Sequence, residues 1–209
     1  MTEPPELSVV IPVFNEEENL EVLQDRLTTV LDDLTDRWEV LYVDDGSRDR
    51  SVALIKAHHA ADPRVKLIRL SRNFGHQAAL NAGLAPARGE AVIMMDADLQ
   101  DPPEVLPRFV AAWRDGAEVA YGIREHRQGN VAKRAGYRTF YRLYRRLADI
   151  DVPLDAGDFC LMDRRVVDVV NRMPEHRVFV RGLRAWAGFR QRAVPYARPA
   201  RAAGQTKYG

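Results

Sequence analysis

Short apolar runs alternate with helical stretches through the first 124 residues, and this alternation restricts the fold more than any other feature of the chain. The apolar runs are rich in β-branched residues and have the length of strands that are buried on both faces. We expect strands at 7–14, 38–45, 65–71, 91–98 and 118–124, with helices at 16–34, 51–61, 76–85 and 102–116. This order predicts an α/β fold, a mostly parallel sheet flanked by helices.

The first helix is expected to be capped by Asn15. Asn is favoured as an N-cap residue, and Glu16, Glu17 and Glu18 follow it, where the helix dipole favours negative charge. Apolar residues then recur at helical spacing, at Leu20, Leu23, Leu27, Val30, Leu31 and Leu34. A helix is therefore predicted directly after the first strand.

The alternation weakens after residue 124. Residues 130–148 indicate a basic helix with interleaved aromatic residues, residues 158–173 a strand, a turn and a helix, and residues 198–209 a loop. The net charge of +1 hides the basic character of this half of the chain. The positive charge has two interpretations: solvated helix faces, or a surface that faces the phosphates of a nucleotide, a nucleic acid or a lipid headgroup.

Composition excludes several classes of protein. The start of the chain lacks the basic and then apolar run of a signal peptide, and no apolar stretch approaches the ~18 residues that would span a bilayer. The single Cys160 excludes an intrachain disulfide framework and a Cys-rich zinc site. It fits the reducing environment of the cytosol, so a cytoplasmic protein is expected.

Polar residues follow three of the expected strands. Asn15 and Glu16 follow the first strand, Asp44 and Asp45 end the second, and Asp96 and Asp98 end the fourth. Each could be a helix cap or a turn residue, but the carboxyl ends of parallel strands meet at one edge, where ligands bind. Crowded carboxylates repel each other unless they titrate or share a cation, and carboxylate oxygens suit Mg²⁺ or Mn²⁺.

The spacing of the two aspartates leaves one condition open. In a regular strand Asp96 and Asp98 would point to opposite faces, so both reach one ion only if the strand ends in a turn. Gln100 could then add a neutral oxygen.

Two other classes of enzyme carry a characteristic motif directly after a strand. Haloacid-dehalogenase-type phosphatases also have Asp-x-Asp, but Leu99 and Gln100 depart from their usual continuation, and the strand here is the fourth rather than the first. A dinucleotide-binding Rossmann enzyme needs G-x-G-x-x-G, which does not occur in this chain. Nucleic acid is not expected as a partner, because the acidic site would repel its backbone.

Five motifs then occur in order: "SVVIPVFNEEENL", "VDDGSRDRS", "LSRNFGHQAALNAGL", "MDADLQDPPE" and "DAGDFCLMDRR". Together they resemble the inverting family 2 glycosyltransferases of the polyprenyl-phosphate hexosyltransferase type, such as dolichyl-phosphate mannose synthases and bactoprenol glucosyltransferases. The resemblance runs from Leu7 to Tyr208 and implies the GT-A fold. It also implies a nucleotide-sugar-binding half at 1–124, and an acceptor-side half with a basic C-terminal segment at 125–209 of the same domain.

The resemblance assigns roles to individual residues. It places the nucleotide at Pro12, Phe14, Glu16, Val43, Asp45, Asp96 and Ala97, with Asp45 hydrogen-bonded to the base edge. It places Mg²⁺ or Mn²⁺ at Asp96, Asp98 and Gln100, and the diphosphate and acceptor at Arg124, Arg201 and Lys207. The residues implied for catalysis are Asp158, Asp98 and Arg124. Two residues depart from the pattern: Phe14 stands where Tyr is frequent, and Cys160 where related proteins can carry Arg.

The implied reaction is metal-dependent transfer of a hexose from a nucleotide-sugar to a polyprenyl phosphate. "SRNFGHQAAL" and "DAGDFCLMDRR" favour UDP-glucose as the donor, with GDP-mannose next. A non-catalytic nucleotide-sugar-binding module and a nucleotidyltransferase stay open as alternatives. The basic segments imply an anionic membrane surface as partner, at the cytoplasmic face, and a homo-oligomer is left open. Relatives continue beyond "KY" into membrane helices that this sequence is expected to lack.

Overall fold

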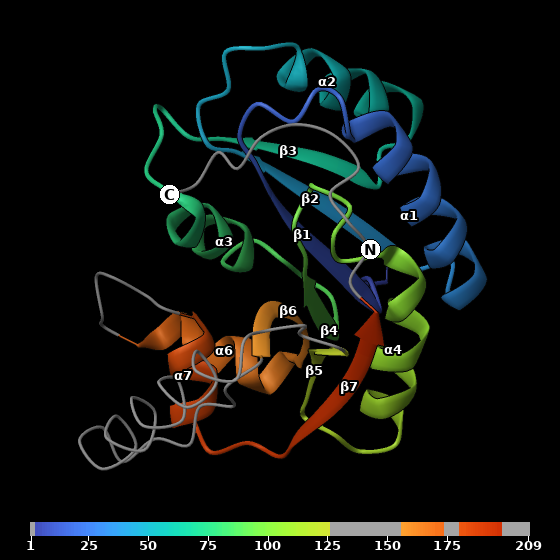
Figure 1. Ribbon diagram of the computed structural model, residues 1–209, viewed down its shortest axis with the longest axis vertical. Coiled ribbons are helices and arrows are strands. Elements are labelled where there is room, and N and C mark those ends of the chain that lie inside the picture. The colour runs from blue at the N-terminus through green and yellow to red at the C-terminus, as the bar shows by residue number, and fades with distance from the viewer. Residues whose placement is uncertain (1–2, 126–155, 174–179, 198–209) are drawn as a thin grey trace.

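A computed structural model describes residues 3–125, 156–173 and 180–197, and they contain one seven-stranded sheet (Figure 1). The sheet order is β3-β2-β1-β4-β6-β5-β7. The strands are β1 Leu7–Val13, β2 Trp38–Asp44, β3 Val65–Arg69, β4 Ala91–Met94, β5 Val119–Glu125, β6 Ala156–Asp163 and β7 Gln191–Ala197. The helices are α1 Leu20–Leu34, α2 Ser51–Ala61, α3 His76–Leu84, the 3₁₀ turn η1 Pro103–Val105, α4 Leu106–Arg114, α6 Arg164–Arg172 and α7 Val180–Trp186.

The sheet is mostly parallel, as the alternation of strands and helices predicted. Strands β3, β2, β1 and β4 run parallel, as do β5 and β7, whereas β6 lies antiparallel to both β4 and β5. The expected strand–turn–helix at 158–173 is confirmed as β6 and α6. Strand β7 was not predicted, because Pro195 interrupts its short apolar stretch, residues 193–197. It lies at the border of the sheet, where Pro195 is tolerated.

Helices cover both faces of the sheet. Helices α1, α2 and α4 lie on one face and α3, α6 and α7 on the other (Figure 1). In α1, the leucines at 20, 23, 27 and 31 are buried, which confirms the predicted helical spacing. Helix α3 approaches the sheet closely because Gly83 has no side chain: a Cβ there would lie 2.3 Å from Val10 Cγ1 and 2.9 Å from Val43 Cγ2.

The predicted cap of the first helix was wrong. Helix α1 begins at Leu20, not after Asn15, which has the positive φ of 54°. Residues 15–17 are instead tied to the loop after β2: the Asn15 N–H donates to Ser47 Oγ (2.9 Å), and the Arg48 N–H donates to Asn15 Oδ1 (2.8 Å). These long-range hydrogen bonds hold the segment in a non-helical, turning path that a local capping rule does not capture.

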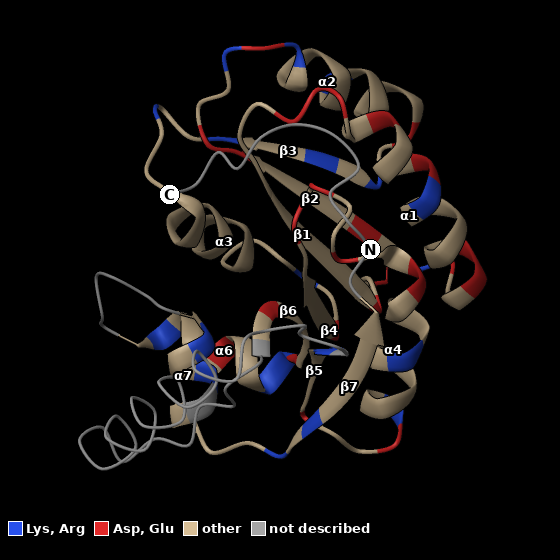
Figure 2. Ribbon diagram, viewed as in Figure 1, with Lys and Arg blue, Asp and Glu red and all other residues tan. Residues whose placement is uncertain are grey.

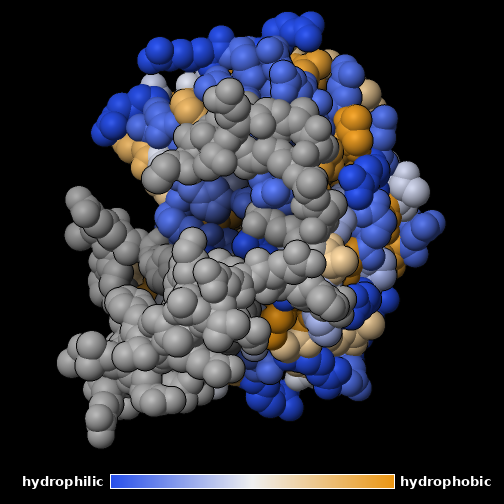
Figure 3. All heavy atoms as spheres, viewed as in Figure 1, coloured by the Kyte–Doolittle hydropathy of each residue, from blue (hydrophilic) through white to orange (hydrophobic). Residues whose placement is uncertain are grey.

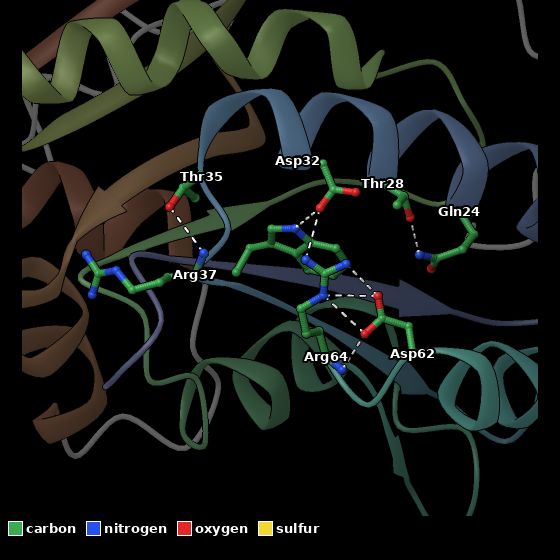
Figure 4. Close-up of polar contacts among 8 residues, drawn as sticks. Gln24, Thr28, Asp32, Thr35, Arg37, Asp62 and Arg64 are labelled. Carbon is green, nitrogen blue, oxygen red and sulfur yellow. Dashed lines mark hydrogen bonds and ion pairs between the residues drawn. The ribbon is translucent and has the colours of Figure 1, made fainter. Parts of the chain in front are cut away.

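Polar clusters fasten the amino edge of the sheet, opposite the carboxyl ends of the parallel strands. Asp32 Oδ1 accepts hydrogen bonds from Trp38 Nε1 (2.8 Å) and Arg64 Nη1 (2.9 Å), and the Arg64 guanidinium stacks 3.7 Å from the Trp38 ring centroid (Figure 4). Arg64 also pairs with Asp62 at 2.8 Å. These contacts join the end of α1 to the starts of β2 and β3.

A second cluster surrounds the buried Glu39 of β2. Its Oε1 accepts hydrogen bonds from Ser8 Oγ (2.6 Å) and the Arg88 N–H (2.8 Å), and its Oε2 lies 2.5 Å from Lys66 Nζ. Burial alone would raise the pKa of Glu39, but these hydrogen bonds and the Lys66 charge lower it below its ordinary value. The ionised form of Glu39 is therefore part of the folded structure.

Charge is distributed unevenly over the helices. Helices α6 and α7 carry basic residues near strands β5 and β6 (Figure 2). In the described part of the face seen in Figure 3, hydrophilic residues predominate. None of the helices in the described ranges is long and apolar enough to cross a bilayer.

Candidate functional site

A cavity lies at the carboxyl ends of β1 and β4, beside the first residue of α3. The residues that line it are Pro12, Phe14, Glu16, His76, Asp96, Ala97 and Asp98. Six of these seven were predicted from the sequence as nucleotide or metal residues; His76 was not. The expectation that polar residues after the first and fourth strands meet at one edge is confirmed.

The segment after β1 supplies one wall of this cavity. The Glu16 N–H donates to Ser51 Oγ (2.9 Å), and Glu16 Oε2 accepts a hydrogen bond from Asn19 Nδ2 (2.7 Å). Because both the backbone and the carboxylate of Glu16 are held, the wall is fixed before any ligand arrives. Phe14 offers a ring without a hydroxyl at its place in the lining.

The two aspartates after β4 face the same cavity because the strand ends early. Strand β4 stops at Met94, and the backbone turns at Leu99, whose φ is +60°. The Gln100 N–H donates to Asp98 Oδ1 (3.0 Å), which closes the turn. The strict alternation of a strand therefore no longer applies at Asp96 and Asp98, and the condition that the sequence left open is met.

The carboxylate oxygens at this turn are suitable ligands for a hard cation. Asp96 and Asp98 bring carboxylate oxygens to one cavity, with the Asp96 side chain 35% exposed. Among the described residues no group of three or more His, Cys, Asp or Glu side chains could hold a metal alone. Mg²⁺ is commonly held by one or two carboxylates together with substrate phosphates and water, which matches two aspartates at an open cavity. Gln100 is not among the lining residues, and its role as a ligand stays a prediction.

His76 lies between two carboxylates of the site, those of Asp96 and Asp158. Its Nε2 lies 2.7 Å from Asp96 Oδ1, and its Nδ1 lies 3.8 Å from Asp158 Oδ2. Burial lowers the pKa of His76, but the hydrogen bond with Asp96 and the negative charges of Asp96, Asp158 and Asp45 outweigh burial and raise it above its ordinary value. The imidazole is therefore stabilised in its charged form between carboxylates.

Asp158 lies on β6, opposite the end of β4. Gln77 Nε2 donates to its Oδ2 (2.9 Å), and Arg181 Nε lies 3.6 Å from its Oδ1. The structure thus brings Asp158, which the family resemblance implied for catalysis, close to Asp96, with His76 between them. Its function there stays a prediction.

Asp45 and Val43 lie beside the cavity rather than in its lining. Asp45 is buried, and its two carboxylate oxygens accept hydrogen bonds from the N–H groups of Phe74 (2.7 Å) and Gly75 (2.9 Å). Val43 is buried beneath α3. Asp45 therefore holds the loop that leads into α3, and contact of either residue with a nucleotide stays a prediction.

Arg124 at the end of β5 belongs to a second polar group. Tyr196 on β7 donates from its hydroxyl to Asp101 Oδ1 (2.5 Å) and also contacts the Arg124 guanidinium. Burial and the Asp101 charge raise the pKa of Tyr196 above its ordinary value. Arg201, Lys207 and the basic segment 130–148 lie outside the described residues.

The sequence missed the residues that join these parts. They are His76, Gln77, Asp101, Arg181, Arg184 and Tyr196. Of these, His76 and Gln77 were assigned only to the start of a helix. Arg184 on α7 is fully buried, and in the part of the chain that the structure describes its guanidinium makes no hydrogen bond to an oxygen atom. It lies next to the buried Cys160 and 5.3 Å from the Tyr121 ring centroid.

Comparison with known proteins identifies the family. Residues 8–170 match glycosyl transferase family 2. The chain is 48% identical over 202 residues to the uncharacterized glycosyltransferase YkcC of Bacillus subtilis (strain 168), covering 96% of this chain and 62% of the relative. It is 36% identical over 203 residues to a prophage bactoprenol glucosyl transferase homolog of Escherichia coli (strain K12), covering 97% and 66%. The chain thus spans less than two thirds of the length of these relatives.

A solved structure supports the architecture. The mannosyltransferase PcManGT from Pyrobaculum calidifontis, in complex with GDP-Man and Mn²⁺, superposes with a TM-score of 0.67 at 22% identity, covering 99% of this chain and 59% of that one. This likeness bears on the fold alone, and the fold is the predicted GT-A fold. The family match, the two relatives and the fold agree, and the chain belongs to glycosyltransferase family 2.

Proposed function

We propose that this chain is a catalytic domain that transfers a hexose from a nucleotide-sugar to a polyprenyl phosphate, with inversion at the anomeric carbon. The observation that carries the proposal is the cavity that Asp96 and Asp98 share with the segment after β1. Asp158 lies close to this cavity, because His76 contacts both Asp96 and Asp158. A donor diphosphate at the aspartates and an acceptor at Asp158 would place the two reactants side by side.

UDP-glucose is the proposed donor, with GDP-mannose next. Two lines support this order: the two motifs that resemble bactoprenol glucosyltransferases, and the name of the E. coli relative, a bactoprenol glucosyl transferase homolog. Proposed nucleotide residues are Pro12, Phe14, Glu16, Val43, Asp45, Asp96 and Ala97.

Asp96 and Asp98, with Gln100, are the proposed ligands of Mg²⁺ or Mn²⁺. A bound cation would neutralise the charge that develops on the diphosphate as the sugar leaves. The chain's own cations serve the same end: we assign Arg124, Arg201 and Lys207 to the diphosphate and the acceptor phosphate.

The acceptor phosphate is proposed to attack the anomeric carbon on the face opposite the leaving nucleotide, through an oxocarbenium-like transition state. A phosphate monoester has a second pKa of about 6 and is mostly dianionic at neutral pH, so its oxygen is already a nucleophile. Asp158 therefore orients the acceptor in this scheme and need not remove a proton.

The basic segment 130–148 is the proposed contact with an anionic membrane at its cytoplasmic face. Each Lys or Arg near such a surface contributes about 1 kcal/mol, and several would hold the domain there reversibly. Screening within a Debye length of about 8 Å makes this attachment sensitive to salt.

The donor is tested by a thermal-shift panel of UDP- and GDP-sugars with Mn²⁺, because a ligand that binds the native state raises the melting temperature. The acceptor is tested with labelled UDP-glucose and a short polyprenyl phosphate, alongside the matching free alcohol. Transfer to the phosphate alone supports the proposal, whereas transfer to the alcohol or to a soluble glycan, but not to the phosphate, contradicts it. Binding without release of nucleotide would indicate a non-catalytic module, and release of pyrophosphate from a nucleoside triphosphate a nucleotidyltransferase.

A further inference from the structure

Two adjacent residues open helix α3, and their side chains contact different carboxylates of the site. His76 contacts Asp96 on the donor side, and Gln77 contacts Asp158 on the acceptor side. The two carboxylates belong to β6 and to the turn after β4, so they come from distant parts of the chain. The first turn of α3 is thus the shared support of both.

His76 has the geometry of a residue that orients a metal ligand. Its Nε2 lies 2.7 Å from Asp96 Oδ1, while Asp96 itself lines the cavity beside Asp98. A hydrogen bond to one carboxylate oxygen restricts the rotation of that carboxylate and so orients it toward the cavity that it lines. Outer partners of this kind commonly change metal affinity by about 10- to 100-fold.

Gln77 uses both ends of its amide. Its Nε2 donates to Asp158 Oδ2 (2.9 Å), and its Oε1 accepts a hydrogen bond from the Val180 N–H (3.2 Å), at the first residue of α7. The amide also approaches His76 Nδ1 at 3.4 Å. Because Val180 holds the amide oxygen, the orientation of the amide is set, and it directs one of the two N–H groups of Nε2 toward Asp158.

Residues of α3 other than His76 and Gln77 pack this helix against the sheet. Ala79, Leu80, Gly83 and Leu84 are the buried residues of this helix. His76 and Gln77 are only partly buried and contribute polar contacts to the site. Anchoring of α3 on the sheet and orientation of the carboxylates are therefore separate tasks of separate residues.

We propose that His76 and Gln77 are a pair of positioning residues, His76 for Asp96 as a cation ligand and Gln77 for Asp158 beside the acceptor. The pair sets the spacing between donor and acceptor groups through one rigid turn. This inference rests on the proposed function, since it assigns Asp96 to the cation and Asp158 to the acceptor.

The His76 half is tested by Mn²⁺ binding to the full chain, with free Mn²⁺ followed by electron paramagnetic resonance in the presence of UDP and, separately, GDP. His76→Leu removes the N–H donor at similar size and should weaken Mn²⁺ binding about 10- to 100-fold. His76→Gln keeps a donor of similar reach and should bind within a few-fold of the parent. His59→Leu on α2, remote from the cavity, is the matched control and should leave Mn²⁺ binding unchanged.

Two results would overturn the His76 half. One is a Leu variant that binds Mn²⁺ as tightly as the parent, or more tightly, which would mean that His76 competes with the cation or is irrelevant to it. The other is a Gln variant as weak as the Leu variant, which would mean that the N–H donor is not what matters.

The Gln77 half is tested by two substitutions that separate its two hydrogen bonds. Gln77→Lys can donate to Asp158 but cannot accept from Val180, whereas Gln77→Glu can accept from Val180 but cannot donate to Asp158. If Gln77 positions Asp158, the Glu variant should lose roughly tenfold to hundredfold in kcat at unchanged donor KM, the loss expected for one hydrogen bond to a charged group. The Lys variant should keep most of the kcat.

The opposite ranking, with Gln77→Lys inactive and Gln77→Glu active, would show that Gln77 only anchors α7 and would overturn this half. Gln191→Glu on β7 is the matched control, because Gln191 contacts neither carboxylate, and it should leave kcat unchanged. Failure of the proposed function looks different: the parent itself would then transfer no hexose, which rejects the Gln77 half. The Mn²⁺ measurements on the His76 variants would still decide the other half.

Discussion

Asp45 offers a direct measurement of what its carboxylate does. Asp45→Asn keeps the size of the side chain but replaces one oxygen by an NH₂ group. In the structure both oxygens accept backbone hydrogen bonds, from Phe74 at 2.7 Å and Gly75 at 2.9 Å. The variant therefore loses one charge-assisted hydrogen bond, sets a donor against a donor, and weakens the other hydrogen bond by removing the charge.

The expected loss follows from these two contacts. A hydrogen bond to a charged group is worth about 1.5–3 kcal/mol and a neutral one about 0.5–1.5, so the free energy of unfolding should fall by about 2–4 kcal/mol. For a domain of this size 1 kcal/mol corresponds to about 2–4 °C, so the melting temperature should fall by about 4–16 °C. Calorimetry on the parent and the variant measures this shift, with the exposed Asp33→Asn on α1 as control.

A melting temperature within about 1 °C of the parent would refute this reasoning, because the carboxylate would then not hold the loop. The same protein also decides the predicted contact with the base. Nucleotide affinity that falls by more than the control, measured well below the melting temperature, supports a direct contact. Unchanged nucleotide affinity in a destabilised variant would show that Asp45 stabilises the loop and does not contact the base.

The remaining predictions concern the cation, the acid stability, the packing of α3 and the buried cation of α7. Asp98→Asn should abolish metal-dependent UDP binding with the fold intact by circular dichroism, and equal UDP affinity of the parent with and without chelator would contradict this. The lowered pKa of Glu39 means that its stabilisation is full above the unfolded value of 4.5 and is lost as pH falls through the lower folded value. Glu39→Gln should therefore be less stable than the parent at pH 7, and the gap should narrow below about pH 4.5 in urea unfolding; a constant gap would argue against the linkage. Gly83→Ala should lower the free energy of unfolding by about 1–3 kcal/mol through overpacking, and an unchanged urea midpoint would show that α3 can shift freely. Arg184→Met should raise the melting temperature, because it removes a buried charge that no carboxylate or carbonyl oxygen among the described residues hydrogen-bonds, and a lower melting temperature would show that neighbours such as Cys160 and Tyr121 stabilise the guanidinium.

The parallel half of the fold could be predicted because its information is local. The strands β1 to β4 are rich in apolar residues, and a polar residue stands at the end of each strand or two positions beyond it, so both the elements and their shared edge follow from the sequence. The antiparallel strand β6 could be located but not oriented, since pairing with β4 and β5 depends on the path of the intervening chain. Strand β7 has an alternating, half-exposed pattern and is recognised only by its pairing with β5.

The candidate site divides in the same way. Asp96 and Asp98 could be predicted because a strand end and a turn are written in neighbouring residues. The contact between Gln77 and Asp158 joins residues 81 positions apart, and no local pattern announces it. Asn15 shows the converse: the local rule for a cap was satisfied, but hydrogen bonds to Ser47 and Arg48 decided its conformation.

The left-handed backbone at Leu99 has a consequence for ligand binding. A residue with a side chain adopts a φ of +60° at a cost of about 1–3 kcal/mol, and persists there only when its surroundings hold it. Leu99 is 4% exposed and packs in the core, so the surroundings do hold it. The turn that carries Asp96 and Asp98 is thus ordered during folding. A ligand that binds these carboxylates therefore does not lose affinity by having to order the turn. Leu99→Gly would make the turn more flexible. Ligand affinity would then be lower by the free energy needed to order the turn on binding.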